Sequence, residues 1–345
     1  MPLFHLGFPA PSIGDLTMSD HAALARLCEQ LGFTTLWHSN HRFYREMFIR
    51  MAASAMPTER IGLGGAVAEP YGVHPALTAQ SLATVDELSG GRAMLALGAG
   101  SSGFQSMGIK RHRPAVALRE AYAVIKRLLA GEEVTFEGEI IRVYRARLQF
   151  VPGHSIPLWI ATRGDRILET SGEYSDAVMI ATYATPKGVR EAMGLVERGA
   201  KRAGRSLDGL RLMSRVDTCV HRDYKLAYDG TRLMIAGLLW SSYPDRNFVK
   251  RVGLEVPAEI ETLIAKRDYN LVAQAAKLVP DEFVKAFCWA GTPEMVAESV
   301  IVVARASGIR EFGFWALLAP GQTREDATQL IADEVLPRIR SALDK

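Results

Sequence analysis

The chain has 345 residues, of which 48% are hydrophobic and 23% are charged, close to the averages of globular proteins. This composition excludes intrinsic disorder, collagen-like repeats and a coiled coil, and no apolar run approaches the about 20 residues that cross a bilayer. The formal net charge of +3 is small and dispersed, which argues against nucleic acid as a partner. The first residues also lack the basic leader and apolar stretch of a secretory signal. We therefore expect a soluble, cytoplasmic protein that binds neither membranes nor nucleic acids.

The histidines and cysteines do not form a metal-site pattern. Cys28, Cys219 and Cys288 are far apart and match no metal or redox spacing. His38 and His41 have an H-x-x-H spacing, but no carboxylate or third ligand follows at the spacing that a metal site needs. We expect reduced, buried cysteines and no metal ion.

Short β-rich apolar runs alternate with helix-like segments along almost the whole chain. The runs that predict strands span residues 3–8, 33–38, 60–67, 92–98, 157–161, 176–181, 210–220 and 310–317. Segments with apolar residues at helical spacing include 19–32, 74–91, 115–132, 292–308 and 323–343. Strands separated by helices imply parallel pairing with right-handed crossovers, and eight such units close naturally into a (β/α)8 TIM barrel. An open doubly wound sheet is the alternative, since the number of strands does not prove closure.

Two stretches interrupt this alternation. Residues 131–156 alternate polar and apolar positions around a turn at Gly138, which predicts a β-hairpin insertion. Residues 222–291 look helical and are divided by prolines, and we assign them to a helical cap insertion near the active-site end of the barrel. Residues 1–345 are thus expected to form a single barrel domain.

The residues Gly98-Ala-Gly100-Ser-Ser-Gly103 formally match G-x-G-x-x-G, the dinucleotide-binding fingerprint. The match is weak, because the motif follows the fourth strand instead of the first and no helix begins directly after it. We interpret it as a glycine loop at the rim of the barrel whose backbone approaches a cofactor closely, with a simple turn as the alternative.

Four long runs, residues 31–48, 62–104, 156–180 and 278–300, resemble the luciferase-like family of flavin and deazaflavin barrel enzymes. The resemblance is closest to the branch of methylenetetrahydromethanopterin reductase and its relatives, which use coenzyme F420. It covers essentially the whole chain in collinear order, both insertions included. The family implies the luciferase-like form of the (β/α)8 barrel.

The resemblance also implies a set of catalytic residues at the end of the second strand. The family carries a Ser/Thr-Asp-His type motif beside the deazaflavin ring, and Ser39-Asn40-His41 occupies that place here. His41 is the candidate catalytic group, because imidazole can donate or accept a proton near neutral pH. The alternative is that His41 only hydrogen-bonds to backbone at the rim. Asn40 can bond to the cofactor but cannot exchange protons.

The cofactor-binding positions follow from the same resemblance. The third strand of these enzymes ends in a bulge with a non-prolyl cis peptide against the back of the ring, which corresponds to Ala66 and Val67 here. The family binds the cofactor's phosphate between the fifth strand and its helix, at Thr162, Arg163 and Gly164. From the other side, Gly98, Gly100 and Ser101 would line the cofactor.

This sequence departs from the reductase branch at two positions. That branch carries acidic residues after the first and fourth strands, where this chain has Pro9 and Ser101. A missing carboxylate removes a proton donor, so we do not expect tetrahydromethanopterin reduction itself. The nearest free carboxylate at the rim is Glu69, a candidate acid or base whose alternative role is a plain surface charge.

The substrate pocket is expected to be apolar and partly aromatic. The candidate lining residues are Pro9, Tyr44, Tyr71 and Trp315, which fall at or near predicted rim positions, although barrel aromatics often serve only in core packing.

Three functions remain open from the sequence. The first is an F420-dependent oxidoreductase that transfers a hydride between the deazaflavin and a small organic substrate. The second is a two-component monooxygenase that receives reduced FMN from a separate flavin reductase and activates oxygen. The third, of another class, is a barrel that binds a flavin or deazaflavin without turnover. Family members are often homodimers, and we expect the same here.

Overall fold

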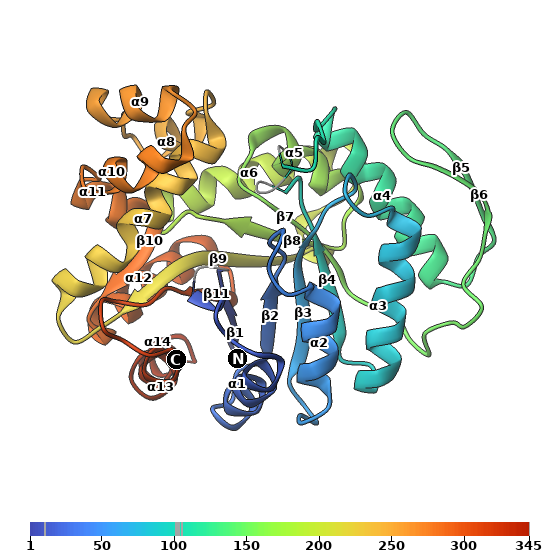
Figure 1. Cartoon of the computed structure of the whole chain (residues 1–345), viewed down its shortest axis with the longest axis horizontal. Helices are drawn as coiled ribbons and strands as arrows, with labels where there is room; N and C mark the ends of the chain where they lie inside the picture. The colour runs from blue at the N-terminus through green and yellow to red at the C-terminus, as the bar shows by residue number, and fades with distance from the viewer. Residues whose placement is uncertain (10–11, 101–103, 105, 345) are drawn as a thin grey trace.

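The structure is a computed structural model that describes residues 1–9, 12–100, 104 and 106–344. In this part of the chain, eight parallel strands close into a barrel in the order β1–β2–β3–β4–β7–β8–β9–β11, with β11 pairing back to β1 (Figure 1). The strands are β1 (Leu3–Phe8), β2 (Thr35–Ser39), β3 (Gly62–Ala68), β4 (Ala93–Leu97), β7 (Leu158–Thr162), β8 (Ala177–Ala181), β9 (Arg211–Val220) and β11 (Glu311–Ala316). All eight predicted strands and the closed barrel are confirmed, and the open sheet is excluded.

Helices cover the outside of the barrel between successive strands. They are α1 (Met18–Gln30), α2 (Met47–Ala55), α3 (Pro75–Ser89), α4 (Pro114–Leu129), α5 (Asp165–Tyr174), α6 (Pro186–Arg202) and α12 (Pro293–Ser307). Their ends follow local rules: Thr17 and Asp20 form a capping box at the start of α1, and α3 ends at Gly90 with φ 65°. None of the helices in the described residues is long and apolar enough to span a membrane.

The last predicted helix is divided into three segments. The chain forms α13 (Arg324–Leu330), a π-helical turn (Ile331–Val335) and α14 (Leu336–Leu343). The division has a physical reason, because Pro337 lacks an N–H and its ring would clash with the carbonyl one turn earlier in a continuous α-helix.

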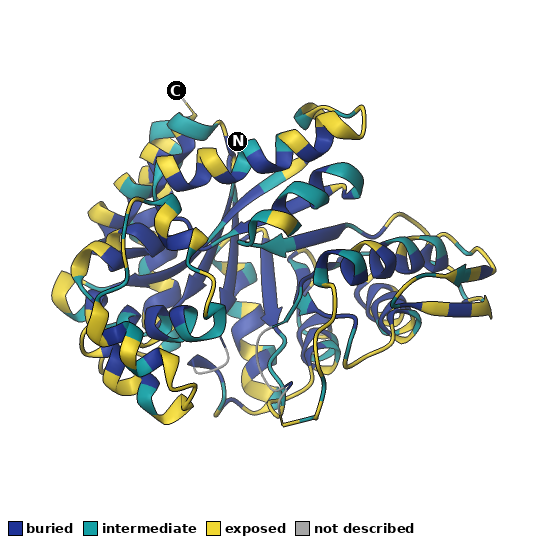
Figure 2. Ribbon diagram, turned by 90° about the horizontal axis from the view of Figure 1, so that it is seen from above, coloured by how far each residue is buried: buried dark blue, intermediate teal, exposed yellow. Residues whose placement is uncertain are grey.

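Both insertions are confirmed. The hairpin consists of β5 (Val134–Glu137) and β6 (Arg142–Ala146), which pair antiparallel and extend away from the barrel (Figures 1 and 2). The cap contains α7 (Tyr224–Ser242), α8 (Asn247–Arg251), α9 (Ala258–Ala265), α10 (Val272–Ala276) and α11 (Asp281–Phe287). It ends in an unexpected ninth parallel strand, β10 (Cys288–Gly291), which pairs with β9 outside the barrel ring.

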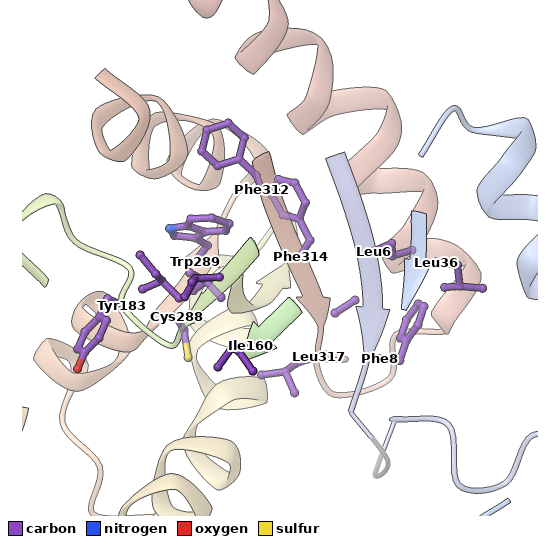
Figure 3. Close-up of a cluster of buried hydrophobic side chains, with 14 of the residues drawn as sticks. Leu6, Phe8, Leu36, Ile160, Tyr183, Cys288, Trp289, Phe312, Phe314 and Leu317 are labelled. Atoms are coloured by element: carbon purple, nitrogen blue, oxygen red, sulfur yellow. The ribbon is translucent and has the colours of Figure 1, made fainter. Parts of the chain in front are cut away.

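The hydrophobic core has two layers because successive strand residues point to opposite faces. The outer layer lies between strands and helices, where Trp289 of β10 packs against Phe312 and Phe314 of β11 (Figure 3). The inner layer fills the barrel and includes Trp37 and Trp159, whose rings meet edge to face with centroids 6.2 Å apart. The barrel is therefore a packed core and not a channel.

A polar cluster of His5, Arg211 and Glu311 lies toward the amino-terminal ends of the barrel strands, with His5 buried and Arg211 exposed. The Nε2 of His5 lies 3.3 Å from Glu311, and Arg211 pairs with the same carboxylate at 2.9 Å. The Nε1 of Trp37 donates to Nδ1 of His5 at 3.4 Å. Burial lowers the pKa of His5, with Glu311 opposing that shift.

Replacing Gly199 by alanine should destabilise the protein, because α5 and α6 cross with almost no space between their backbones. The added Cβ would lie 1.6 Å from the carbonyl oxygen of Glu169, so we expect a loss of about 3 kcal/mol of unfolding free energy. Gly194→Ala on the same helix is the control: its Cβ would meet nothing within 4 Å, and it should stabilise by about 0.5–1 kcal/mol. Urea unfolding followed by circular dichroism compares the two variants, and equal midpoints would contradict this packing.

Candidate active site

The end of β3 is bulged and is held by the neighbouring segment after β2. The Ala66–Val67 peptide bond is cis, as the family resemblance implies, and the register between β3 and β4 shifts between Ala66 and Ala68. The backbone N–H of Asn40 donates to the Ala66 carbonyl at 2.9 Å, and its side-chain Nδ2 donates to the Val67 carbonyl at 3.0 Å. Asn40 therefore ties the two strand ends together.

Arg42 extends this tie to the loop after β3. Its Nη1 donates to Oδ1 of Asn40 at 3.2 Å, and its Nη2 forms an ion pair with Glu69. The guanidinium also lies over the Phe104 ring, 5.6 Å from the centroid. Because Arg42 occupies Oδ1, the Asn40 amide is oriented with its N–H group toward Val67. Arg42 was not singled out from the sequence, in which it is one of many dispersed cations.

Glu69 differs from its expected role. It is only 4% exposed, and besides the ion pair with Arg42 it accepts backbone N–H bonds from Tyr71 at 2.6 Å and Gly72 at 2.9 Å. It is neither a free rim carboxylate nor a plain surface charge. A carboxylate so fully paired shapes the loop after β3, and this corrects its assignment as the nearest free acid or base.

His41 lies at the mouth, partly buried between cations. Burial lowers its pKa to about 4, with smaller contributions in the same direction from Arg50, Arg215 and Arg42. The Tyr44 ring stands edge-on to the imidazole, with centroids 6.1 Å apart. His41 is therefore neutral at pH 7, able to accept a hydrogen bond or proton through one ring nitrogen and to donate through the other.

The glycines after β4 bring backbone close to this tie. A Cβ on Gly98 would lie 3.0 Å from the Val67 side chain, and one on Gly100, where φ is +65°, would lie 2.8 Å from the Phe104 ring. Larger residues at either place would displace these neighbours. Ser101, the third position predicted here, lies outside the described residues.

A second polar corner forms where β7 meets α5. The Oγ1 of Thr162 accepts the Gly164 N–H at 3.1 Å, and Gly164 is the N-cap of α5. The Nη2 of Arg163 donates to the hydroxyls of Ser241 and Ser242 on α7, at 3.2 and 2.8 Å. Burial lowers the pKa of Arg163 to about 10, with Asp217 and Asp245 opposing that shift from a distance, and no carboxylate in the described part of the chain forms an ion pair with it. This corner combines a cation with a helix N-terminus, which suits an anion.

The acidic residue nearest this corner is already neutralised. Asp165, the first residue of α5, pairs with Arg251 at 2.5 Å, and Arg251 also donates to the Tyr183 hydroxyl at 3.2 Å. Asp165 therefore contributes little net negative charge against an incoming anion.

The predicted pocket residues divide into two groups. Pro9 is buried at the end of β1, Tyr44 is 48% exposed beside His41, and Tyr71 packs edge-on against Phe104 while donating its hydroxyl to a backbone carbonyl at 3.0 Å. Trp315 instead belongs to the packed barrel interior. It is 3% exposed, so its assignment to the pocket lining is corrected to core packing.

The structure adds a charged pair that the sequence analysis did not select. Arg215 and Asp217 on β9 pair through two hydrogen bonds of 3.2 and 2.9 Å, and the Arg215 guanidinium stacks over Trp315, 4.5 Å from its centroid. Alternating charged residues inside an apolar strand were the signal available, since alternate positions of a barrel strand face its interior.

Asn40→Asp should lower stability at pH 7, because a carboxylate has no N–H to donate to the Val67 carbonyl. Leaving that acceptor facing negative charge should cost about 1–3 kcal/mol of unfolding free energy. The control is Asn270→Asp, since Asn270 is exposed on the cap and its side chain donates to no strand end. Urea midpoints measure both variants, and an unchanged midpoint for Asn40→Asp would show that the tie adds nothing to stability.

Known proteins share this architecture over nearly the whole chain. The model of the luciferase-like monooxygenase family matches residues 3–311. The chain is 31% identical over 322 residues to the 5,10-methylenetetrahydromethanopterin reductase of Archaeoglobus fulgidus, covering 91% of this chain and 94% of that one. It is 28% identical to the F420-dependent glucose-6-phosphate dehydrogenase of Nocardia farcinica, over 84% of this chain and 82% of that one.

Among solved structures, the coenzyme F420-dependent tetrahydromethanopterin reductase of Methanopyrus kandleri superposes with a TM-score of 0.83 at 26% identity, covering 98% of this chain and 99% of that one. The family model spans most of the sequence. The chain belongs to the luciferase-like monooxygenase family.

Proposed function

We propose that this protein is an F420-dependent oxidoreductase that transfers a hydride between the deazaflavin and a small organic substrate. The choice of cofactor rests on the similarity, over 91% of the chain, to a reductase of the branch that uses F420, and on further relatives whose names specify F420. The family's name includes monooxygenases, so the fold by itself does not choose between F420 and FMN.

The residues at the mouth suit a flat ring with an anionic side chain. The bulge at Ala66 and Val67 presents backbone to one side of the mouth, held by Asn40. Across the mouth, the corner at Arg163 offers a cation that donates to two neutral hydroxyls. Gly164, beside it, leaves open space where a side chain would stand, with only Thr162 Oγ1 near, at 3.9 Å. We assign the ring to the bulge and the phosphate to this corner.

When bound, a deazaflavin supplies two-electron hydride chemistry. The chain's own contribution is to orient the ring against the bulge, to exclude water and to handle a proton. His41 is the group for that last task, because its neutral imidazole can take a proton from a substrate hydroxyl or hold a hydrogen bond to a carbonyl. Glu69 is unavailable for it, since Arg42 and two backbone N–H groups already occupy its carboxylate.

The FMN-dependent monooxygenase is the second candidate, favoured by the name of the family model. The same anion corner would hold the phosphate of FMN, and a separate flavin reductase would then be the partner. Binding without turnover, and a homodimer, also stay predictions. Cofactor preference separates the first two candidates.

F420 should bind the purified apoprotein with micromolar or tighter affinity in a fluorescence titration, while FMN should bind much more weakly. Arg163→Met should weaken F420 binding by about 10- to 100-fold, because a charge-assisted bond to phosphate is lost. Arg166→Met is the control, since Arg166 is exposed in the first turn of α5, three residues after Arg163. Preference for FMN would contradict the proposed function, and equal affinity in Arg163→Met would contradict the phosphate position.

The pH dependence of turnover should reflect a neutral His41. Because its pKa is lowered to about 4, the neutral form is present throughout pH 6–8 and is lost only as the pH falls through about 4. A kcat/KM profile of the F420-loaded enzyme should therefore show no inflection from His41 near pH 6.5. His41→Gln should lower kcat by about 100-fold or more with the Kd for F420 nearly unchanged. Weakened F420 binding at unchanged kcat would disprove this role.

A further inference from the structure

Arg50, on α2, is a buried cation whose charge has no carboxylate partner in the described part of the chain. It is 2% exposed, and its Nε donates to the Arg45 carbonyl at 3.1 Å while its Nη2 donates to the Ser39 carbonyl. Glu46 acts on it electrostatically, but that carboxylate already accepts the Ile49 N–H at 2.9 Å at the start of the helix. Burying a charge without an opposite charge is costly, so the arrangement favours an anion nearby.

The Arg50 guanidinium lines a small hollow at the rim of the barrel. The other lining residues come from the loop after β1, from α1 and from the end of β2: Ile13, Gly14, His21, Ser39, Tyr44 and Arg45. Two arginines and a histidine therefore meet there, and no acidic residue belongs to the described lining. The hollow has a volume of about 10 Å³, which is room for a single oxygen atom of a carboxylate or phosphate and not for a ring.

The hollow adjoins the candidate proton-transfer group. Ser39 and Tyr44 line it, and they flank His41 in the same short segment after β2. The Tyr44 ring contacts the imidazole of His41 edge to face, and the charge of Arg50 contributes to the low pKa of His41. A molecule with one end in the hollow would therefore have its next atoms close to His41.

We propose that this hollow is a subsite for an anionic oxygen group of the substrate, a carboxylate or a phosphate, with Arg50 as its charge partner and Arg45 and Tyr44 at its entrance. The proposal rests on the proposed function, and it narrows the substrate to small molecules that carry such a group next to the reacting carbon. The charges around the subsite are balanced only in part. Asp20 acts on His21, Asp15 is engaged by Arg324, and Glu46 acts on Arg50 without forming an ion pair with it, so that Arg50 and Arg45 face a single carboxylate.

The test uses the full chain without F420 and two probes, acetate and inorganic phosphate, at pH 7 and constant ionic strength. The side-chain Nε–H resonance of Arg50, in protein labelled with ¹⁵N, should shift saturably with one probe or both, with a millimolar or tighter Kd. A shift with acetate alone assigns a substrate carboxylate, and a shift with phosphate alone assigns a phosphate ester. A linear, unsaturated response equal to that of chloride would overturn the proposal.

Variants identify the residues responsible. Arg45→Gln should weaken probe binding about 10-fold while leaving the urea midpoint nearly unchanged, because Arg45 is exposed and folding does not depend on it. Arg26→Gln, an exposed arginine on α1, is the matched control and should bind the probe like the parent protein. Arg50→Gln should abolish binding if it folds. Unchanged binding in Arg45→Gln would place the anion elsewhere and overturn the assignment.

The F420 titration described above separates the two proposals. Saturable probe binding without F420 binding would keep the subsite and remove the deazaflavin function. F420 binding without a saturable probe shift would keep the cofactor and remove the subsite.

Discussion

The hydrogen bond from the Asn40 side chain to the Val67 carbonyl is the constraint on which the mouth of this barrel depends. It joins the segment that carries His41 to the bulge that is proposed to support the ring. Arg42 fixes the orientation of the amide, and Glu69 fixes Arg42 while also shaping the turn at Tyr71 and Gly72. The bulge at Val67 is thus linked through Asn40, Arg42 and Glu69 to the segment after β2 and to the loop after β3.

The electrostatic potential at the mouth depends on which arginines form ion pairs with carboxylates. Arg42 and Arg215 are each neutralised by a carboxylate, whereas Arg50 and Arg163 are not paired in the described part of the chain. The two unpaired cations lie at separate places, one behind the end of β2 and the other between β7 and α5. Burial is the main reason that His41 is neutral, and Arg50 lowers its pKa further. The two unpaired cations provide two distinct positions at which an anionic group is stabilised.

The fold could be predicted from periodicity because each barrel strand is a short apolar run bounded by turn residues, and all eight such runs became strands. The strand β10 could not, because four residues, Cys288–Gly291, are too few to show a period, and only the edge of β9 makes them a strand. The bulge was located by family resemblance, and nothing in the letters of GGAVA alone distinguishes it from an ordinary strand. The π-helical turn before Pro337 had a signal in that proline, but a helical period spans it without interruption.

The candidate site was predictable only as far as the backbone determines it. The positions at the ends of β2, β3 and β7 follow from topology, because carboxyl ends of parallel strands meet at one end of a barrel. The topology does not determine which side chains form ion pairs there. Glu69 was interpreted as free because its partner, Arg42, comes from a different strand end, and Trp315 was interpreted as a rim residue although its ring turns into the barrel. Arg50 shows no pattern in the sequence, because only the structure reveals that no carboxylate among the described residues forms an ion pair with it.

The ion pairs of Glu69 and Asp217 also bear on the acidic residues that this chain lacks relative to the reductase branch. Where the resemblance to the reductase branch implies acidic residues, this chain has Pro9 after the first strand, Ser101 after the fourth and Asn40 after the second, and none of these side chains is an acid. The carboxylates that remain near the mouth, Glu69 and Asp217, are held by arginines and cannot act as proton donors without breaking an ion pair. His41, in contrast, is a neutral imidazole near the cations of Arg50, Arg215 and Arg42. It can therefore form a hydrogen bond with a substrate oxygen.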